Sequence, residues 1–338
     1  MKILLLSHYF YPQIGGIEIN SELLAIAFHN HGHEVRLLTW SADPGNKHFD
    51  YTIIRQPDVK TLLKQHMWAD VVFENNPCLR LAWPAYFLRK PSVVALCTWV
   101  SRSDGTSAWQ DKLKLRWLKR ADKVIAVSNA IKEVCFPPAV VIGNPYGVDI
   151  FKTLPAVQRN LDFVFLGRLV SDKGADLAIE AIHQLKEESI KFTLTIVGDG
   201  DEMLPLKKMV EDYQLQDLVT FTGALRGDVL VRKLNEHKYM LVPSRWKEPF
   251  GNVALEGMAC GCLPIVADGG GLPDAVGEAG IVFERGSVDS LVNAIKNLRA
   301  NVELEKSLRA KADLHLLNHH PEMIAKKYLE VLSNAVKH

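Results

Sequence analysis

The stretch "KILLLSHYFYPQIGGIE" (residues 2–18) decides the fold class. Its apolar run predicts a buried strand, which leads through a glycine-bearing turn into a helix near 17–31, and "HEVRLLTW" (33–40) predicts the next strand. A strand, a glycine turn and a helix in this order usually hold a phosphate group. Gly15 and Gly16 are adjacent, however, so the turn lacks the G-x-G-x-x-G spacing of a dinucleotide site.

The same alternation of apolar strands and helices runs through both halves of the chain. Further strands of the first half are predicted at 70–75, 92–98, 123–128 and 139–144, with helices between most of them. In the second half, strands are predicted at 161–169, 192–200, 219–223, 239–244, 263–268 and 280–284, and helices at 174–188, 202–213, 252–260, 287–317 and 321–336. Strands that alternate with helices indicate parallel sheets covered on both faces.

This pattern predicts an α/β protein of two Rossmann-like, doubly wound domains that face each other across a cleft. The 338 residues exceed what one hydrophobic core usually supports. Regularity lapses over 144–160, which we interpret as a linker. We expect an N-terminal domain at 1–150 and a C-terminal domain at 156–318, with a helix at about 321–338 packed back on the first. Ligands of such sheets bind at the carboxyl ends of the strands, so the functional loops should face the cleft.

Composition excludes several classes of protein. The 40 basic and 39 acidic residues nearly balance, which argues against nucleic acid as the main partner. No apolar run approaches the ~20 residues that cross a membrane, and the N-terminal run is too short for a signal peptide. The five cysteines are scattered, which argues against a disulfide framework. Cys260 and Cys262 lack a second ligand pair for zinc, so we interpret them as buried small residues. The sequence thus predicts a cytoplasmic protein.

The segment 244–276 carries the most chemical information. "EPFGN" (248–252) predicts a turn after a strand, and a helix then begins whose free N–H groups and positive dipole end form an anion site. Glu248 precedes this site, and Glu256 lies one turn into the helix. Either glutamate alone would be explained as a surface charge. Together they match a nucleotide-diphosphate sugar, whose sugar and ribose hydroxyls flank its diphosphate.

A second candidate element follows the first strand of the C-terminal half. "GRLVSDKG" (167–174) places Arg168 and Lys173 around one loop at the carboxyl end of that strand. Their cationic groups would both reach one diphosphate and stabilise the charge of a leaving nucleoside diphosphate without a metal. Alone, the two residues would be interpreted as solvated charges.

These motifs resemble those of glycosyltransferase family 4, which are retaining enzymes with the GT-B fold of two facing Rossmann domains. "EPFGNVALE" (248–256) is similar to the family's E-x7-E signature, and "GRLVSDKG" to its G-R-L-x-x-x-K-G loop. "GGGLPDAV" (269–276) is similar to its G-G-x-P-E segment, with Asp274 where glutamate is usual. Further similar segments are "YPQIGGIE" (11–18), "HGHEV" (31–35), "ADKVIAVS" (121–128), "GVD" (147–149) and "VGDGDE" (197–202).

The resemblance implies a reaction. A hexosyl unit would move with retention from a nucleotide-diphosphate sugar to a sugar or lipid-linked acceptor, in polysaccharide, lipopolysaccharide or glycolipid synthesis. UDP-sugar is the default donor and GDP-mannose a second candidate. The leaving phosphate would take the acceptor's proton on the same face. No cofactor and no metal are implied, and we interpret "DGD" (199–201) as a strand-end turn, not a metal site.

The resemblance also implies a role for each site residue. Glu248 would contact the donor sugar near the reacting carbon, Arg168 and Lys173 would bind the diphosphate, and Glu256 would hold the ribose. These first three are the predicted catalytic residues. The predicted donor site as a whole comprises Gly15, Gly16, Arg168, Lys173, Val197, Gly198, Gly223, Ala224, Leu225, Glu248, Phe250, Gly251, Asn252, Val253 and Glu256.

Within this site, the amides of 250–252 would assist in binding the diphosphate. The base would lie near 197–198 and the 223–226 turn, largely against backbone. The small size of Gly15 and Gly16 would let the first domain approach the donor's distal phosphate and sugar when the domains close.

One position departs from the family pattern. Family members commonly have a histidine after the strand that matches "KPSVVALCTWVS" (90–101), whereas this chain has Cys97 there and no histidine in 67–182. We interpret Cys97 as a buried small residue and not as a nucleophile. Candidates to replace the histidine are Thr98, Ser101, Arg102 and Asp104. The predicted acceptor residues are Trp99, Ser101, Arg102 and Asp104.

The basic segment "WQDKLKLRWLKR" (109–120) has two open interpretations. It would rest on anionic lipid headgroups as an amphipathic helix, or it would be a solvated helix whose apolar side packs on the sheet. The sequence favours the second.

Three other functions remain as alternatives. A phosphorylase or sugar-nucleotide epimerase would use the same fold, and a non-catalytic nucleotide-sugar-binding protein would fit the absent histidine. A nicotinamide dehydrogenase is the weakest alternative, because "QIGGIE" (13–18) lacks the required glycine spacing.

Overall fold

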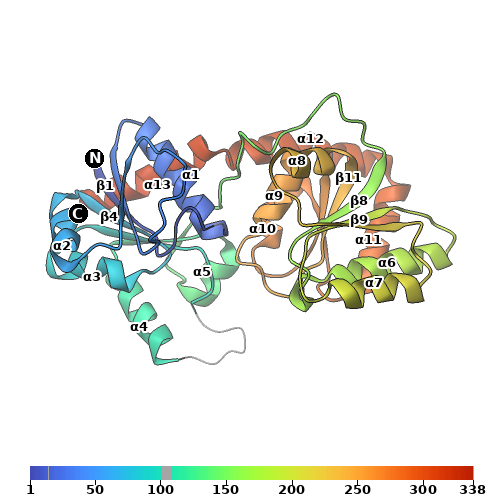
Figure 1. The fold of residues 1–338 in the computed structure, drawn as a ribbon, viewed down its shortest axis with the longest axis horizontal. Helices are drawn as coiled ribbons and strands as arrows, with labels where there is room; N and C mark the ends of the chain where they lie inside the picture. The colour runs from blue at the N-terminus through green and yellow to red at the C-terminus, as the bar shows by residue number, and fades with distance from the viewer. Residues whose placement is uncertain (14, 101–107, 338) are drawn as a thin grey trace. The chain divides into compact units, whose positions relative to one another are not determined.

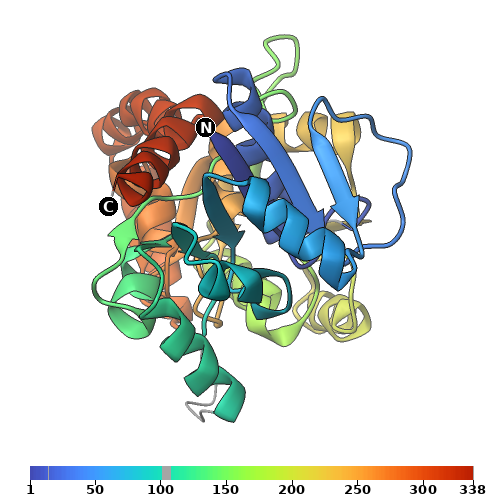
Figure 2. The same cartoon turned by 90° about the vertical axis from the view of Figure 1, so that its left-hand side faces the viewer.

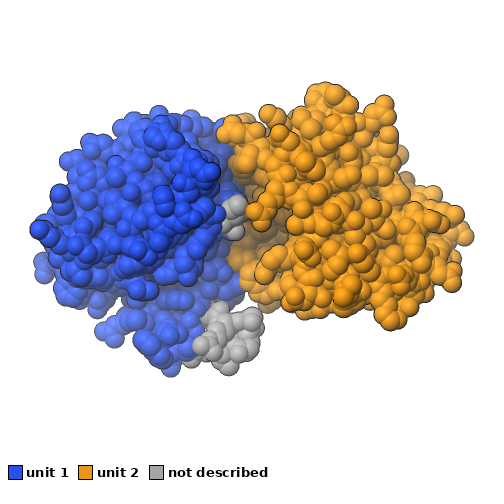
Figure 3. Space-filling view, viewed as in Figure 1, with its two compact units in different colours: residues 1–145, 319–338 blue, residues 146–318 orange. Residues whose placement is uncertain are grey.

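The chain divides into two compact units, each with its own core (Figures 1 and 3). The computed structural model describes residues 1–13, 15–100 and 108–337. Unit 1 comprises Met1–Pro145 and His319–His338, and unit 2 comprises Tyr146–Asn318. The division falls inside the segment 144–160, and the C-terminal helix belongs to unit 1.

Unit 1 is built on a parallel sheet. In the described part of this unit, seven strands follow the order β3-β2-β1-β4-β5-β6-β7, so the direction of winding reverses between β1 and β4. The strands are β1 (Lys2–Leu6), β2 (Glu34–Thr39), β3 (Thr52–Arg55), β4 (Val71–Asn75), β5 (Ser92–Leu96), β6 (Lys123–Ala126) and β7 (Val140–Val141). The helices are α1 (Gly16–Asn30), α2 (Val59–Trp68), α3 (Leu79–Phe87), α4 (Trp109–Leu118), α5 (Asn129–Cys135) and α13 (Pro321–Val336).

Helices cover both faces of this sheet, which explains why β1 is apolar at every position after Lys2. Leu4 and Leu6 pack in one cluster with buried residues of α2 and α3. On the other face, Phe73 of β4 contacts the rings of Phe28 in α1 and Tyr328 in α13. The two chain ends lie close together here (Figures 1 and 2).

Unit 2 repeats the architecture. Within its residues, all of which the structure describes, six parallel strands follow the order β10-β9-β8-β11-β12-β13, and the winding reverses between β8 and β11. The strands are β8 (Leu161–Leu166), β9 (Leu194–Val197), β10 (Val219–Gly223), β11 (His237–Val242), β12 (Leu263–Ala267) and β13 (Ile281–Phe283). The helices are α6 (Ala175–Glu187), α7 (Met203–Asp212), α8 (Gly227–Asn235), α9 (Asn252–Ala259), α10 (Leu272–Val276), α11 (Val288–Ala300) and α12 (Val302–Asn318), with 3-10 turns η1 (Ser171–Lys173) and η2 (Gly277–Ala279).

The structure differs from the sequence-based elements in a few places. The helical pattern over 287–317 is two helices, because Asn301 leaves the helical conformation and its Oδ1 accepts the amide of Leu304 at 3.0 Å, at the start of α12. The strand expected at 139–144 is only β7, and β3 was not expected at all. In the ranges that the structure describes, no helix is long and apolar enough to cross a membrane.

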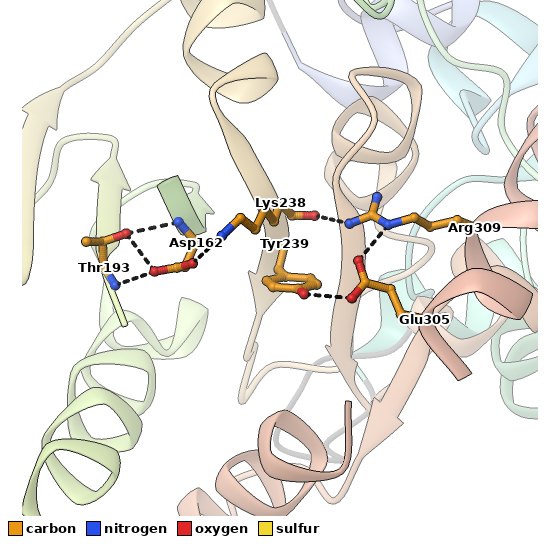
Figure 4. Close-up of polar contacts among 6 residues, drawn as sticks. All are labelled: Asp162, Thr193, Lys238, Tyr239, Glu305 and Arg309. Carbon is orange, nitrogen blue, oxygen red and sulfur yellow. Dashed lines mark hydrogen bonds and ion pairs between the residues drawn. The ribbon is translucent and has the colours of Figure 1, made fainter. Parts of the chain in front are cut away.

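A polar network at the amino ends of the unit 2 strands ties α12 to the sheet (Figure 4). Glu305 of α12 accepts hydrogen bonds from Tyr239 Oη at 2.9 Å and from Arg309 Nε at 2.8 Å. Beside it, Lys238 Nζ of β11 lies 3.0 Å from Asp162 Oδ1 of β8. This network lies at the opposite ends of the strands from the loops that carry the predicted donor site.

Candidate functional site

Two predicted catalytic residues meet at the point where the winding of unit 2 reverses. Lys173 follows β8 and Glu248 follows β11, and these strands are neighbours in the sheet. Lys173 Nζ lies 2.5 Å from Glu248 Oε1, and the side chains are 19% and 12% exposed. Ser244 Oγ donates to the same carboxylate oxygen at 3.0 Å. The structure therefore brings the two loops that carry these residues into direct contact.

Glycines bring the backbones around this pair unusually close together. Gly174 has a φ of +74°, and a Cβ there would lie 2.1 Å from the carbonyl oxygen of Pro243. Gly270 has a φ of +64°, and a Cβ there would lie 2.1 Å from the carbonyl oxygen of Glu248. Gly271 N also donates to that oxygen at 2.7 Å. Larger residues would push apart the loops that carry the charged groups.

The structure contains the helix that the sequence predicts after Glu248. Gly251 is the N-cap of α9 with a φ of +111°, and Asn252 is the first helical residue. The side chain of Phe250 is buried, which anchors the loop, while Asn252 and Val253 are partly exposed. The first amides of α9 thus follow Glu248 along the chain, as the sequence predicts.

Glu256 lies one turn into α9. The atoms packed around its carboxyl group raise its pKa to about 7, because burial disfavours the charged form. A partly exposed carboxyl that is easily protonated both donates and accepts hydrogen bonds, which suits ribose hydroxyls.

The predicted base region shows one constraint that the sequence did not reveal. Gly198 N donates to Gly223 O at 3.0 Å, so these two backbone groups already pair with each other. A Cβ on Gly198 would lie 1.8 Å from Gly167 O, whereas Gly223 faces open space. Val197, which precedes Gly198 in the chain, is buried. After Gly223, Ala224 is exposed and Leu225 is partly exposed.

The remaining residues of the predicted sites lie as follows. Arg168 is exposed on the loop after β8. Gly15 is the N-cap of α1 with an extended φ of −158°, a conformation that any residue adopts, and Gly16 begins the helix. Trp99 is partly exposed after β5. Ser101, Arg102 and Asp104 lie outside the described residues.

Cys97 belongs to a buried polar cluster at the carboxyl ends of β4 and β5. Its Sγ donates to Asn75 Oδ1 at 3.1 Å, and Asn75 Nδ2 donates to Ser21 Oγ at 2.6 Å. Burial raises the pKa of Cys97 to about 12, so the thiol is protonated at neutral pH. This environment is typical of a structural cysteine and not of a nucleophile.

The segments considered as metal sites are engaged in other contacts. Asp199 Oδ1 accepts the amide of Gly200 at 2.8 Å, as in a turn. Cys262 Sγ donates to Leu234 O at 3.2 Å. Among the described residues, no cluster of three or more His, Cys, Asp or Glu side chains has the arrangement of a metal site.

Sequence reasoning missed the residues that hold the charged pair in place. Ser244 touches Glu248 directly, and Arg245 pairs with Asp176 of α6. The Arg245–Asp176 pair depends on which strands become neighbours, and the Ser244–Glu248 contact on the path of the loop after β11.

The comparison with known proteins identifies the unit that carries this geometry. Residues 149–315 match the family of glycosyl transferases group 1. Unit 2 is therefore a glycosyl transferases group 1 domain. The chain is 24% identical to the GPI3 subunit of Saccharomyces cerevisiae phosphatidylinositol N-acetylglucosaminyltransferase, over 91% of this chain and 76% of that protein. It is 28% identical to an uncharacterized glycosyltransferase of Methanocaldococcus jannaschii, over 91% of each.

Solved structures of glycosyltransferases share the fold of the whole chain. HepE of Anabaena in complex with UDP matches 99% of this chain and 100% of its own chain, with a TM-score of 0.83 and 20% identity. Sucrose-phosphate synthase of Thermosynechococcus elongatus matches 98% of both chains, with a TM-score of 0.77 and 21% identity. The expected GT-B fold of two Rossmann-like units is thereby confirmed.

Proposed function

We propose that this protein is a retaining, metal-independent hexosyltransferase that uses a nucleotide-diphosphate sugar. The observation that carries the proposal is the Lys173–Glu248 pair at the switch point of unit 2, followed by the amino end of α9. A cation paired with a carboxylate, and a helix that begins directly after that carboxylate in the chain, match the diphosphate and hydroxyl groups of such a donor.

Each group has a defined task in the proposed reaction. Lys173 and Arg168 bind the diphosphate and stabilise the negative charge that grows on it as the anomeric C–O bond breaks. Glu248 accepts hydrogen bonds from sugar hydroxyls and fixes the ring, and Glu256 holds the ribose. The acceptor oxygen forms the new glycosidic bond on the face that the phosphate leaves, and its proton passes to that phosphate.

The donor and acceptor are proposed at the level of chemical class. UDP-sugar is the first candidate, which the HepE complexes with UDP and UDP-glucose support, and GDP-mannose is the second. A sugar or a lipid-linked acceptor fits, because several relatives are phosphatidylinositol N-acetylglucosaminyltransferase subunits. We propose a cytoplasmic role in polysaccharide, lipopolysaccharide or glycolipid synthesis.

The outer face of α4 supports a location against an anionic membrane. Trp109 is 72% exposed and Leu113 45% exposed, and the exposed cations Lys112 and Arg116 lie on the same face. The inner side of α4 is held against β4, where Trp117 Nε1 donates to Glu74 Oε1 at 2.7 Å. Each of the two interpretations of residues 109–120 therefore describes a different side of α4. The outer side has the composition of an interfacial helix.

Vesicle binding tests this location. We expect the protein to sediment with phosphatidylglycerol vesicles and not with phosphatidylcholine vesicles, and the Lys112→Glu/Arg116→Glu variant to lose most of that binding. Lys191→Glu, an exposed charge change in unit 2, is the matched control and should bind as the wild type does. Equal binding by all three proteins would refute the proposed face.

A panel of nucleotide-diphosphate sugars tests the activity itself. A donor present at 100 times its Kd should stabilise the protein by about 2.7 kcal/mol, and the same donor should be slowly hydrolysed or transferred. The proposal fails if no UDP-, GDP- or ADP-sugar binds or turns over. Dependence on inorganic phosphate would indicate a phosphorylase, a product without a glycosidic bond an epimerase, and binding without any turnover a non-catalytic protein.

A further inference from the structure

A second ion pair lies beside the Lys173–Glu248 pair, between the two segments that carry it. Arg245 follows β11, and its guanidinium donates to Asp176 Oδ1 at 2.5 Å and to Ser171 O at 3.3 Å. Asp176 lies in the first turn of α6 and Ser171 begins η1. The side chain of Arg245 therefore joins the loop that contains Glu248 to the turn that contains Lys173.

Backbone hydrogen bonds connect the same two segments. The amides of Arg245 and Trp246 both donate to Asp172 O, at 2.8 and 3.0 Å. Asp172 directly precedes Lys173, and Lys173 Nζ lies 5.2 Å from the centroid of the Trp246 ring. The position of Lys173 thus depends on how firmly the loop at 245–246 is held against η1.

The other side of the loop is held as well. Arg285 Nη1 donates to Arg245 O at 3.1 Å, and the amide of Arg285 donates to Asp268 Oδ1 at 2.8 Å. Arg245 is therefore attached through its carbonyl to the segment after β13 and through its side chain to α6. The side-chain bond is the link that a substitution removes without changing the backbone.

We propose that Arg245 and Asp176 form a clamp that positions Lys173 opposite Glu248 and so sets the rate of glycosyl transfer. The inference rests on the proposed function of this site. The guanidinium of Arg245 is directed at α6, so it acts through the backbone of its loop and is a positioning residue. Without the clamp, the backbone bonds remain, but Lys173 samples positions from which it stabilises the leaving diphosphate poorly.

Kinetics of the donor reaction give the first test. We expect Arg245→Ala and Asp176→Asn each to lower kcat by about 10-fold to 100-fold with a smaller change in KM. The double variant should be no slower than the single ones, because each single variant already disrupts the same ion pair. Arg245→Lys should restore most of the rate.

The chain offers a matched control at the other end of the same strands. Lys238 and Asp162 also form an ion pair between β11 and β8, but at their amino ends (Figure 4). Lys238→Ala should therefore keep the wild-type kcat. An equal loss of kcat in Lys238→Ala and Arg245→Ala would overturn the clamp, since any weakened pair between these strands would then suffice.

The reactivity of Lys173 gives a test that does not need the activity. Paired with Glu248 and 19% exposed, its amine should react slowly with an acylating reagent, compared with the 72% exposed Lys208 in the same molecule. Mass spectrometry should show several-fold faster acylation of Lys173 in Arg245→Ala, and no change in Lys238→Ala. Unchanged acylation in Arg245→Ala overturns the clamp. If the wild type turned over no donor, the proposed function would fail, while the acylation rates would still decide whether the clamp holds Lys173.

Discussion

Lys173 and Glu248 neutralise each other in the structure, at 2.5 Å between Nζ and Oε1. Ser244 adds a hydrogen bond to the same oxygen at 3.0 Å. A diphosphate that binds Lys173 must therefore compete with a carboxylate that already holds it. Under the proposed function we therefore expect the two residues to have opposite effects on nucleoside diphosphate affinity, although the proposed transfer uses both.

We predict that Glu248→Gln separates these effects. The amide removes the charge that competes for Lys173, so UDP should bind at least as tightly as to the wild type. Transfer should fall by about 100-fold or more, because the sugar loses its charged hydrogen-bond acceptor. Calorimetric titration with UDP and a turnover assay measure the two effects. A loss of UDP affinity equal to that of Lys173→Ala would contradict the assignment.

A second prediction concerns the close backbone contact at Gly198. Its φ is +152° and a Cβ would lie 1.8 Å from Gly167 O, so Gly198→Ala forces backbone atoms apart. We expect the free energy of unfolding to fall by more than 2 kcal/mol, roughly the upper cost of left-handed strain alone. Gly286→Ala, with a φ of +80° and open space around it, should cost only about 1–2 kcal/mol. Urea denaturation compares the two, and equal costs would show that the contact is unimportant.

At the scale of elements, a buried carboxyl group connects α4 to β4. Glu74 is fully buried, and its oxygens accept Trp117 Nε1 at 2.7 Å and the amide of Cys78 at 2.8 Å. Burial raises its pKa from 4.5 to about 7, since no bond fully replaces the hydration of the charge. The protonated form is therefore the one that the folded protein favours.

This predicts a pH dependence of stability. The folded-state pKa lies above the unfolded one, so the stabilisation is complete below pH 4.5 and is lost as the pH rises through 7. Between these values the free energy of unfolding should fall by on the order of 3 kcal/mol relative to Glu74→Gln. Glu256 also has a raised pKa and therefore gives a pH dependence of the same direction. Because both proteins contain Glu256, its contribution cancels in the difference between them. A constant difference in the free energy of unfolding between the wild type and Glu74→Gln across this pH range would contradict the assignment.

The elements also show what a sequence can predict. Strands such as β1 were predictable because burial on both faces requires continuous apolar residues. β3 was not, since its residues are exposed or partly exposed. Glu248 and Lys173 were predictable from motifs, but Ser244 and Arg245 were not. The Arg245–Asp176 contact arises because β8 and β11 become neighbours, whereas Ser244 meets Glu248 because their shared loop turns back on itself.

At the scale of the whole molecule, the last helix completes the first unit. Tyr328 of α13 is fully buried and its ring lies 5.5 Å from that of Phe73 in β4. The buried side of α13 is thus part of the core of unit 1, although all of unit 2 separates this helix from the rest of unit 1 in the sequence.

We therefore expect Tyr328→Ala to affect the two units differently. Loss of this side chain should lower the free energy of unfolding of unit 1 by about 3–5 kcal/mol. UDP affinity, measured by calorimetry at a temperature where the variant is folded, should stay near the wild-type value, because all predicted nucleotide contacts except those of Gly15 and Gly16 lie in unit 2. A large loss of UDP affinity in the folded variant would show that unit 1 contributes to nucleotide binding.

The central claim is that Lys173 of unit 2 holds the diphosphate of a nucleotide-sugar donor. Calorimetric titration of wild type, Lys173→Ala and Lys238→Ala with UDP, GDP and ADP tests it most directly. We predict that at least one of these nucleotides binds the wild type and Lys238→Ala equally, and binds Lys173→Ala about 10-fold or more weakly, since a charge-assisted bond contributes about 1.5–3 kcal/mol. Equal affinity for Lys173→Ala and the wild type, or no binding of any of the three nucleotides, would contradict it.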